Sequence, residues 1–434
     1  MPRVLTGLDR VLRDGLSLPG KGRAALLCNA TTVSSAWIPT AEALAHIAGI
    51  RVERVFSPQH GFAAEKQDNM IASADGVHPR LKVPIVSLYG ERREPRAEDF
   101  TGVDALLIDL PDVGTRVYTF LVSAILALKV AARCGLPVFV LDRANPIGRG
   151  AEGPVLEDDL HSFVGVTDIP LRHGLTLAEG CLYGAWRAGL ITAPPQAWRS
   201  FGQAGAQGMA ASEWLHVVPL EGWRGELYFD ETGLPWTMPS PNMPTLDTAI
   251  VYPGQVMLEG TNLSEGRGTT RPFEIFGAPY LDPPVLAEQL VSRGWVTEGA
   301  TSWRLAGTLH GSPSSPLAGA HLREVSYEPT FHRYAGEMVR GFQIHVVDRP
   351  AFRPVSFTVA LLDAIRRTHP AFAWRQPPYE YERERLPIDL ICGTDSVRRS
   401  LDAGPSAEEL IRGWEPGLAA FRERVHPLLL YRED

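Results

Sequence analysis

The sequence predicts an α/β protein: a doubly wound parallel sheet in the first half, followed by a smaller α+β domain. Short apolar segments alternate with helical patterns in the first half of the 434-residue chain, and a proline-rich segment follows them. The apolar segments are continuous rather than alternating in polarity, which suits strands buried on both faces of a parallel sheet. This βαβ rhythm is typical of Rossmann-like folds.

Five strands and several helices are expected in the first half. The strands are short, bounded apolar segments at residues 24–28, 52–56, 83–86, 105–108 and 138–141. Helical patterns cover residues 40–48, 121–133 and 175–189, and a further strand is expected at 215–219. In the last of these helices, Thr176 and Glu179 have the spacing of a capping box, which makes Glu179 a helix cap rather than a catalyst.

The second half is mixed in character. Residues 234–244 contain four prolines and form a stiff junction, with domains expected at residues 1–228 and 229–434. Beyond it, helices are expected at 281–292 and 355–367, and a strand at 341–347. Ser406 and Glu409 have capping-box spacing, and Pro416 should kink or restart the apolar helical pattern that continues to Val425.

Composition excludes several classes of partner. The net charge of -8 argues against nucleic acid or an anionic membrane surface. No apolar stretch approaches the length of a membrane span, and no signal-peptide pattern opens the chain, so a cytoplasmic location is expected. The chain has no Gly-x-Gly-x-x-Gly after the first strand, no CxxC spacing and no His-x-x-x-His spacing. We therefore expect no dinucleotide or other cofactor, and no metal.

Polar side chains follow each of the five expected strands. They are Asn29, Thr31, Ser57, Gln59, His60, Ser87, Tyr89, Asp109, Asp112, Asp142, Arg143 and Asn145. Because the carboxyl ends of parallel strands line the ligand crevice of an open sheet, these positions predict a site there. About half of these residues are expected instead to cap helices or turns.

One polar run in the second half has almost no aliphatic content. Residues 259–274 hold three carboxylates, two guanidiniums, four hydroxyls and one amide on three glycines. Such a loop suits a neutral ligand with many hydroxyls, and the alternative is a solvated surface loop. Trp236, in the proline-rich junction, either stacks on a sugar face or fills an interface.

An ordered set of motifs covers nearly the whole chain. Besides the run at 259–274 and its flanks Tyr252-Pro-Gly254 and Phe276-Gly-Ala-Pro-Tyr280, they lie at residues 56–62, 87–90, 112–119, 141–146, 172–174, 240–242, 329–336 and 345–348. The set resembles the NamZ-type exo-β-N-acetylmuramidases, peptidoglycan-sugar hydrolases formerly known only as a domain of unknown function. One departure matters: the family has Ser-Pro-Glu-His-Gly with a proposed catalytic Glu, and this chain has Gln59 there.

The resemblance implies an exo-acting glycosidase of cell wall recycling. It would remove terminal N-acetylmuramic acid from the non-reducing end of a peptidoglycan-derived saccharide or muropeptide. The alternatives are a glycosidase for a related N-acylamino sugar, or a non-catalytic binding protein for cell-wall sugars. Glycoside cleavage needs a proton for the leaving oxygen, and the substrate's own acetamido group can replace an enzymic nucleophile.

These considerations assign the site residues. Gln59 cannot donate a proton as an acid, so Glu65, six residues on in the same loop, is expected to take that role, with Gln59, His60 and Asp112 beside it. Arg116 or Arg267 is expected to bind the lactyl carboxylate. The active site is expected in a cleft between the domains. The substrate-binding residues expected are Ser57, Tyr89, Arg116, Tyr118, Asp142, Asn145, Arg172, His173, Asn242, Glu259, Asn262, Glu265 and Arg267.

Overall fold

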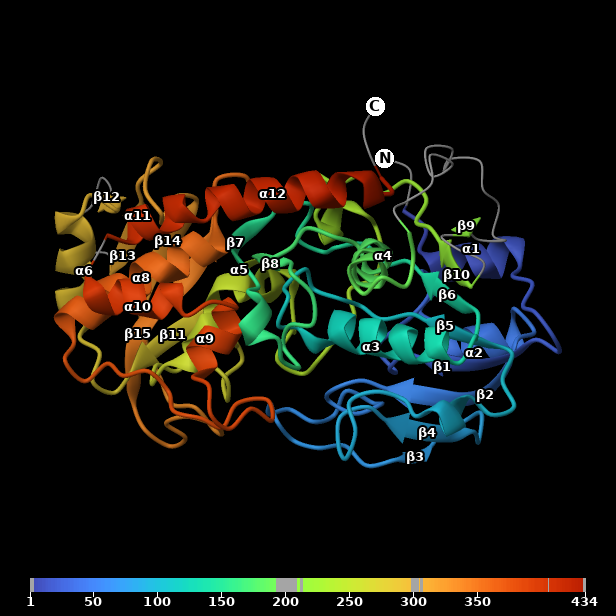
Figure 1. The fold of residues 1–434 in the computed structure, drawn as a ribbon. Helices are drawn as coiled ribbons and strands as arrows, with labels where there is room; N and C mark the ends of the chain where they lie inside the picture. The colour runs from blue at the N-terminus through green and yellow to red at the C-terminus, as the bar shows by residue number, and fades with distance from the viewer. Residues whose placement is uncertain are drawn as a thin grey trace. The chain divides into compact units, whose positions relative to one another are not determined.

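The chain folds into two compact units, each with its own sheet (Figure 1). The computed structural model describes residues 4–192, 209–210, 214–297, 304, 307–404 and 406–431. The first unit comprises Met1–Gly150, His173–Leu246 and Arg422–Asp434, and the second comprises Ala151–Arg172 and Asp247–Phe421. The domain boundary after residue 228 stays a prediction.

The first unit is built on an eight-stranded sheet with the order β3-β4-β2-β1-β5-β6-β10-β9. Its strands are β1 (Arg23–Leu27), β2 (Arg51–Ser57), β3 (Gly76–Val77), β4 (Pro84–Ser87), β5 (Ala105–Ile108), β6 (Val138–Leu141), β9 (Met209–Ala210) and β10 (Leu215–Val218). The six inner strands are parallel, and the short edge strands β3 and β9 pair antiparallel. The predicted parallel sheet is therefore confirmed, with antiparallel edges added.

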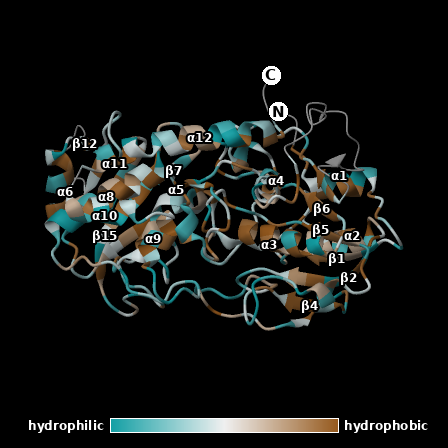
Figure 2. Ribbon diagram, viewed as in Figure 1, coloured by the Kyte–Doolittle hydropathy of each residue, from teal (hydrophilic) through white to brown (hydrophobic). Residues whose placement is uncertain are grey.

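Helices cover both faces of this sheet. On one face, α1 (Gly7–Asp14) and α2 (Thr40–His46) pack on alternate strand residues such as Leu26 and Leu107. The other buried residues of these strands face α3 (Thr119–Arg133) and α4 (Leu177–Arg187), which contact each other and β6. Figure 2 shows the hydrophobic colour along β1, β5, β6 and α3. Burial on both faces explains why these strands read as continuous apolar segments.

The strand order reverses between β1 and β5. From β1, the chain goes to β2 and β4 on one side, and then returns to β5, β6 and β10 on the other. At such a switch point the loops leaving the two central strands diverge and open a crevice at their carboxyl ends. The loop after β1 and the loop after β5 therefore mark where a ligand site is expected in this unit.

The second unit combines an antiparallel sheet with helices. Its five-stranded sheet has the order β11-β15-β14-β13-β12, and β7 and β8 form a separate pair. The strands are β7 (Glu152–Val155), β8 (Pro170–Arg172), β11 (Ile275–Ala278), β12 (Val296–Thr297), β13 (Thr308–Gly311), β14 (Ala320–Tyr327) and β15 (Val339–Val346). The helices are α5 (Leu246–Gln255), α6 (Pro283–Ser292), α8 (Pro354–Thr368), α9 (Pro387–Cys392), α10 (Ser396–Ala403), α11 (Ala407–Gly413) and most of α12 (Glu415–Val425).

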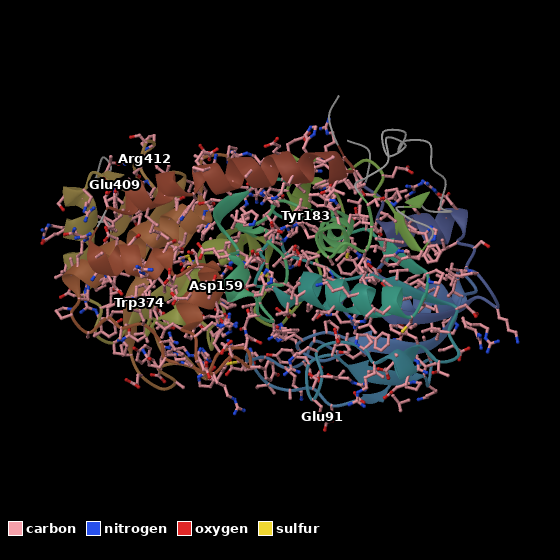
Figure 3. The ribbon with its side chains drawn as sticks, viewed as in Figure 1. Glu91, Asp159, Tyr183, Trp374, Glu409 and Arg412 are labelled. Carbon is pink, nitrogen blue, oxygen red and sulfur yellow. The ribbon has the colours of Figure 1, made fainter. Side chains whose placement is uncertain are left out.

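The two predicted capping boxes and the predicted restart of a helix at Pro416 are confirmed. The hydroxyl of Thr176 caps α4 and that of Ser406 caps α11, each with the predicted Glu completing the capping box. Glu409, the partner of Ser406, is labelled in Figure 3. The apolar pattern from Leu410 to Val425 divides into α11 and α12, and Pro416 lies in the first turn of α12, where it restarts the helix.

No helix among the described residues is long and apolar enough to cross a membrane.

Candidate functional site

A pocket lies at the switch point of the first unit. It is lined by Val33 and Ser35 from the loop after β1, Asp112 from the loop after β5, and Arg143 from the loop after β6. Residues of the segment 229–239, including Trp236, complete the lining. The pocket is thus formed at the carboxyl ends of the central strands, as the topology requires.

Asp112 is positioned by its own turn. Its Oδ2 accepts a hydrogen bond from the backbone N–H of Gly114 at 2.8 Å, the short-range pattern of an Asx turn. Gly114 has φ +78°, and a Cβ there would come within 2.5 Å of Asn145 Oδ1, so this turn needs glycine. The turn holds the Asp112 carboxylate, only 7% exposed, at the pocket wall.

His173, from a distant part of the chain, lies close to the same carboxylate. Its Nε2 is 3.3 Å from Asp112 Oδ2 without hydrogen-bond geometry, and its Nδ1 accepts the N–H of Leu175 at 3.1 Å. Because Nδ1 acts as an acceptor, the neutral ring carries its proton on Nε2. His173 is therefore a close polar neighbour of Asp112.

The second oxygen of Asp112 has a different environment. Asp112 Oδ1 is buried, and none of the described residues hydrogen-bonds it. Buried carboxylate oxygens without a hydrogen-bond partner among the described residues also occur at Glu152, Glu265 and Asp363, but of these four residues only Asp112 lines the pocket. Because such an oxygen is costly to leave unpaired, Asp112 can accept a ligand or water donor there. Nearby, burial raises the pKa of Tyr118 and the charge of Asp112 raises it further, which keeps the phenol a neutral hydrogen-bonding group.

The loop after β2 holds Gln59 and His60. The Oε1 of Gln59 accepts a hydrogen bond from the hydroxyl of Thr119 at 2.6 Å. His60 Nδ1 lies 2.7 Å from the carbonyl oxygen of Lys66, and since a carbonyl only accepts, Nδ1 carries the proton and Nε2 is the acceptor of the neutral ring. Asn242 donates its side-chain N–H to the carbonyl of Gln67 and so joins the same loop.

Glu65 lies on this loop, which folds back on itself. The backbone N–H groups of Ala64 and Lys66 donate to the carbonyls of Gly61 and His60 at 3.0 Å each. The Glu65 carboxylate packs against Gly61, where an added Cβ would lie 2.6 Å from both of its oxygens. The side chain is 50% exposed and pairs with Lys66 at 3.7 Å. Glu65 is thus close to His60 in the folded loop and open to solvent.

Other predicted residues of the first unit are engaged in structure. Asp142 accepts hydrogen bonds from the backbone of Arg143 and Ala178 and from the hydroxyls of Thr176 and Tyr431. Burial raises its pKa to about 7, although these hydrogen bonds act in the opposite direction.

Asn145 bridges the backbone of Leu175 and Ile147. Ser57, Tyr89 and Arg116 are almost completely buried. The ring of Tyr89 stacks under the guanidinium of Arg93, at 5.2 Å.

The polar run of the second unit is a buried ion network. Arg267 NH1 contacts Glu259 Oε1 at 2.6 Å and Glu265 Oε1 at 3.0 Å, and all three side chains are buried. Tyr379 donates to Glu259 Oε2 at 2.9 Å, and His332 Nε2 lies 3.2 Å from Glu265. Burial acts to raise the pKa of Glu265, but His332 and Arg267 together hold it well below its usual range. The alternative of a solvated surface loop is wrong.

Asn262 and Arg172 also lie in the second unit. Asn262 bonds the backbone of Ala371 and Ala373, next to Trp374, which is labelled in Figure 3. Arg172, at the end of β8, is the register partner of Glu152 on β7, and both are buried. The prediction that the two halves share an active-site cleft stays a prediction.

The contacts of Thr119, Phe229 and Thr237 were not anticipated from the sequence. Thr119 bonds Gln59, and Phe229 and Thr237 line the pocket. The sequence does contain a signal for Thr119, since it is the last residue of the motif at 112–119. Within the described ranges, no three His, Cys, Asp or Glu side chains are arranged to hold a metal ion.

The fold and the pocket define a class of protein. In open parallel sheets, enzymes and binding proteins for small polar ligands bind them at the switch point. Here the pocket at that point has an indole in its wall and a carboxylate that can accept a hydrogen bond, the kind of lining that such ligands use.

The comparisons with known proteins identify the family. The models described as Exo-beta-N-acetylmuramidase NamZ, N-terminal, and the corresponding C-terminal region match residues 24–247 and 250–431. The chain belongs to this NamZ family. Peptidoglycan beta-N-acetylmuramidase NamZ of Bacillus subtilis (strain 168) is 33% identical to it, over 99% of this chain and 92% of the relative.

Two crystal structures of DUF1343 family proteins from Bacteroides fragilis NCTC 9343 have the same fold. One is 24% identical with a TM-score of 0.76, covering 99% of both chains. The other is 22% identical with a TM-score of 0.68, covering all of both chains.

Proposed function

We propose that this chain is an exo-acting glycosidase that removes terminal N-acetylmuramic acid from the non-reducing end of peptidoglycan fragments. Its membership of the NamZ family and its match to the Bacillus subtilis enzyme over 99% of the chain support the substrate class. The observation that carries the site is Asp112 Oδ1, which is buried at the wall of the switch-point pocket and has no partner among the described residues.

Asp112 serves the substrate's acetamido group in this proposal. An N-acetylated sugar can use its own amide oxygen as the nucleophile, and a carboxylate that accepts the amide N–H orients and polarises that oxygen. Asp112 has the geometry for this role, because the Gly114 N–H holds Oδ2, His173 lies beside it, and Oδ1 is left as the acceptor. A fixed acceptor of this kind needs little reorganisation during the reaction.

Glu65 supplies the proton to the leaving oxygen. Gln59 keeps the shape of the family's Glu and is held by Thr119, but it cannot change charge at neutral pH. Glu65 is the carboxyl on the same folded-back loop, beside His60. Because its side chain is half exposed, substrate must cover it and exclude water before it can deliver the proton effectively.

The proposal is tested on β-N-acetylmuramides and the matching glucosaminides, with leaving groups of different acidity. Wild type should cleave the muramides. Glu65→Gln should lower kcat by about 10²–10⁴ on a poor leaving group, the usual contribution of a general acid, and lower it much less on a good one. Asp112→Asn should lower kcat on both by about 10²–10³.

Each other outcome reassigns a role. If Glu65→Gln leaves kcat intact while Asp112→Asn abolishes activity, the acid is Asp112. If the glucosaminide is cleaved better than the muramide, the chain is a glycosidase for a related N-acylamino sugar.

The second candidate is a non-catalytic binding protein for cell-wall sugars, and Gln59 is the observation that favours it. On this alternative the pocket and Asp112 bind the sugar, and no carboxyl has replaced the family's Glu. Binding of a muramic-acid saccharide by calorimetry, with no hydrolysis of any leaving group, would establish it.

A further inference from the structure

Trp37 combines a largely exposed side chain with an unusual backbone conformation. Its side chain is 63% exposed, so it contributes little to the core. Its φ is +66°, in the left-handed region that a bulky residue adopts only at a cost. Exposure alone would need no explanation, but a bulky ring on a backbone with positive φ at the edge of a pocket suggests a binding role.

The backbone around Trp37 is held firmly by its own turn. The N–H of Trp37 donates to the carbonyl of Ser34 at 2.9 Å, and the N–H of Ser34 donates to the carbonyl of Ile38 at 2.9 Å. The Ser34 hydroxyl oxygen accepts from the N–H groups of Ala36 and Ile38 at 3.2 Å each. Val33 and Pro39 pair as a bridge at the base of the turn. The indole is therefore presented from a fixed support.

The turn that carries Trp37 also contributes residues to the pocket lining. Val33 and Ser35, which precede Trp37 in the same turn, both line it. Across from them, the segment with Thr237 and Pro239 is tied to the loop after β1: Thr237 donates its hydroxyl to the carbonyl of Thr31 at 2.7 Å, and Asn29 donates to the carbonyl of Pro239 at 3.3 Å.

That segment also carries an exposed apolar side chain. Met238 is 51% exposed and lies between Thr237 and Pro239, two residues of the pocket lining. The turn with Trp37 and the segment with Met238 thus each combine residues that line the pocket with an apolar side chain exposed to solvent.

We infer that Trp37 is a stacking platform for the sugar ring on the aglycone side of the scissile bond, which makes it a residue that selects saccharides over simple glycosides. A pyranose has an apolar face of C–H groups and a polar rim of hydroxyls. The indole can cover the apolar face while the hydroxyls stay hydrated, which a half-solvated site at a pocket edge allows. The inference rests on the proposed function, because that function puts the terminal sugar in the pocket and the next ring outside it.

The test compares two substrates that differ only in the aglycone. They are methyl β-N-acetylmuramide and the disaccharide of N-acetylmuramic acid β-linked to N-acetylglucosamine, with released muramic acid measured by chromatography. Nitrophenyl glycosides are avoided because their ring would itself stack on Trp37. Trp37→Gly removes the indole and suits the positive φ, whereas Trp37→Tyr keeps a ring. Ile47→Ala is the matched control, since Ile47 is 53% exposed and its alteration should affect neither substrate.

Trp37→Gly should raise KM for the disaccharide about tenfold with kcat unchanged, the upper range of an aromatic contact, and should leave the methyl glycoside unaffected. Trp37→Tyr should restore most of the loss. Equal effects on both substrates, or no effect on either, would overturn the platform. If wild type cleaves neither substrate, the proposed function fails, and calorimetry with the disaccharide decides the platform separately. Weaker binding by Trp37→Gly than by wild type supports it, and equal binding or none by wild type overturns it.

Discussion

The pocket of the first unit and the polar run of the second unit both contain buried carboxylates, but only those of the run are paired with an arginine. At the pocket, the Gly114 N–H bonds one oxygen of Asp112, and no Arg or Lys among the described residues pairs with this carboxylate. In the run 259–274, one guanidinium, that of Arg267, contacts both Glu259 and Glu265. Asp112 Oδ1 and Glu265 Oε2 both lack a hydrogen-bond partner among the described residues, so the two regions differ in the cation and not in the unpaired oxygen.

The difference shows what a polar, glycine-containing segment can mean. Charges that neutralise each other inside a fold contribute to its architecture, and ligand binding there would have to break an existing pair. A carboxylate that is held by a backbone N–H and not paired with a cation can accept a ligand donor without breaking an ion pair. Composition treats the two cases alike, and only the partners distinguish them. Four experiments test this distinction.

The largest effect is expected from Arg267→Met. The substitution keeps an apolar chain against the ring of Phe273, which lies 4.8 Å from the guanidinium, but removes the charge between two buried carboxylates. Breaking a buried ion network by removing one partner costs about 3–5 kcal/mol of unfolding free energy. Urea denaturation followed by circular dichroism measures the loss.

Arg340→Met is the control for that measurement. Arg340 lies 3.8 Å from Glu324 in a pair that is exposed on both sides, so its removal should cost about 1 kcal/mol or less. If Arg267→Met is as stable as this control yet no longer binds a muramic-acid saccharide, Arg267 serves the lactyl carboxylate and the contrast between the two regions fails.

The next effect is expected at His173, the close polar neighbour of Asp112. His173→Ala removes the ring whose Nε2 lies 3.3 Å from Asp112 Oδ2, so the carboxylate gains room to rotate and the direction of Oδ1 is less well fixed. We expect kcat to fall about 10–10²-fold with KM little changed, less than the loss for Asp112→Asn. His173→Gln, whose amide can donate from a similar position, should recover part of the activity. Unchanged kcat in His173→Ala would show that Gly114 alone fixes the carboxylate.

The two units should also differ in how pH affects their stability. Burial lowers the pKa of three histidines of the second unit, His310, His345 and His369. Once unfolded, these groups take up protons near pH 6.5, whereas the folded unit resists protonation to lower pH. The unfolded state therefore binds more protons, and the stability that these groups support is lost as pH falls below about 6.5.

Asp142 in the first unit gives the opposite sign. Its pKa is raised to about 7 by burial, so its folded form keeps a proton that the unfolded form loses near pH 3.9. Its contribution is complete at acid pH and disappears as pH rises towards 7. Other groups shift in the opposite sense within each unit. In the first unit the pKa values of His78, Asp14, Asp104 and Glu221 are lowered, and in the second unit those of Glu152 and Asp389 are raised. Variants are therefore needed to isolate the contribution of each group.

The melting temperatures of Asp142→Asn and His369→Gln, measured across pH 4–8, separate the loss of stability at acid pH from the loss as pH rises towards 7. Asp142→Asn should flatten the decline between pH 4 and 7, and His369→Gln should flatten the decline below pH 6.5. Parallel pH profiles for wild type and both variants would contradict the assignment.

Local sequence patterns predicted the framework well, because its determinants are local. Continuous apolar strands, two capping boxes and the restart at Pro416 each depend on residues within a few positions of one another. The partners at the sites are not local. Tyr379 is 120 residues from Glu259, and Thr119 is 60 residues from Gln59. A single sequence shows which side chains are polar near a strand end, but the fold decides which of them satisfy one another.

The smallest effect is expected at Thr119, and it tests whether Gln59 belongs with the pocket residues or with the structural network. The Thr119 hydroxyl donates to Gln59 Oε1 at 2.6 Å, and both groups are buried. Thr119→Val has nearly the same shape but no donor, so Gln59 loses one fixed orientation at a cost of about 1 kcal/mol. If Gln59 orients substrate, Thr119→Val should raise KM for the muramide severalfold. The free energy of unfolding, measured in urea, should fall by no more than this cost of about 1 kcal/mol. Thr119→Ser, which keeps the hydroxyl, is the control and should bind as wild type does. An unchanged KM in Thr119→Val, with a loss of unfolding free energy larger than about 1 kcal/mol, would assign Gln59 to structure. The position that carries the family's acid would then have no part in the reaction of this chain.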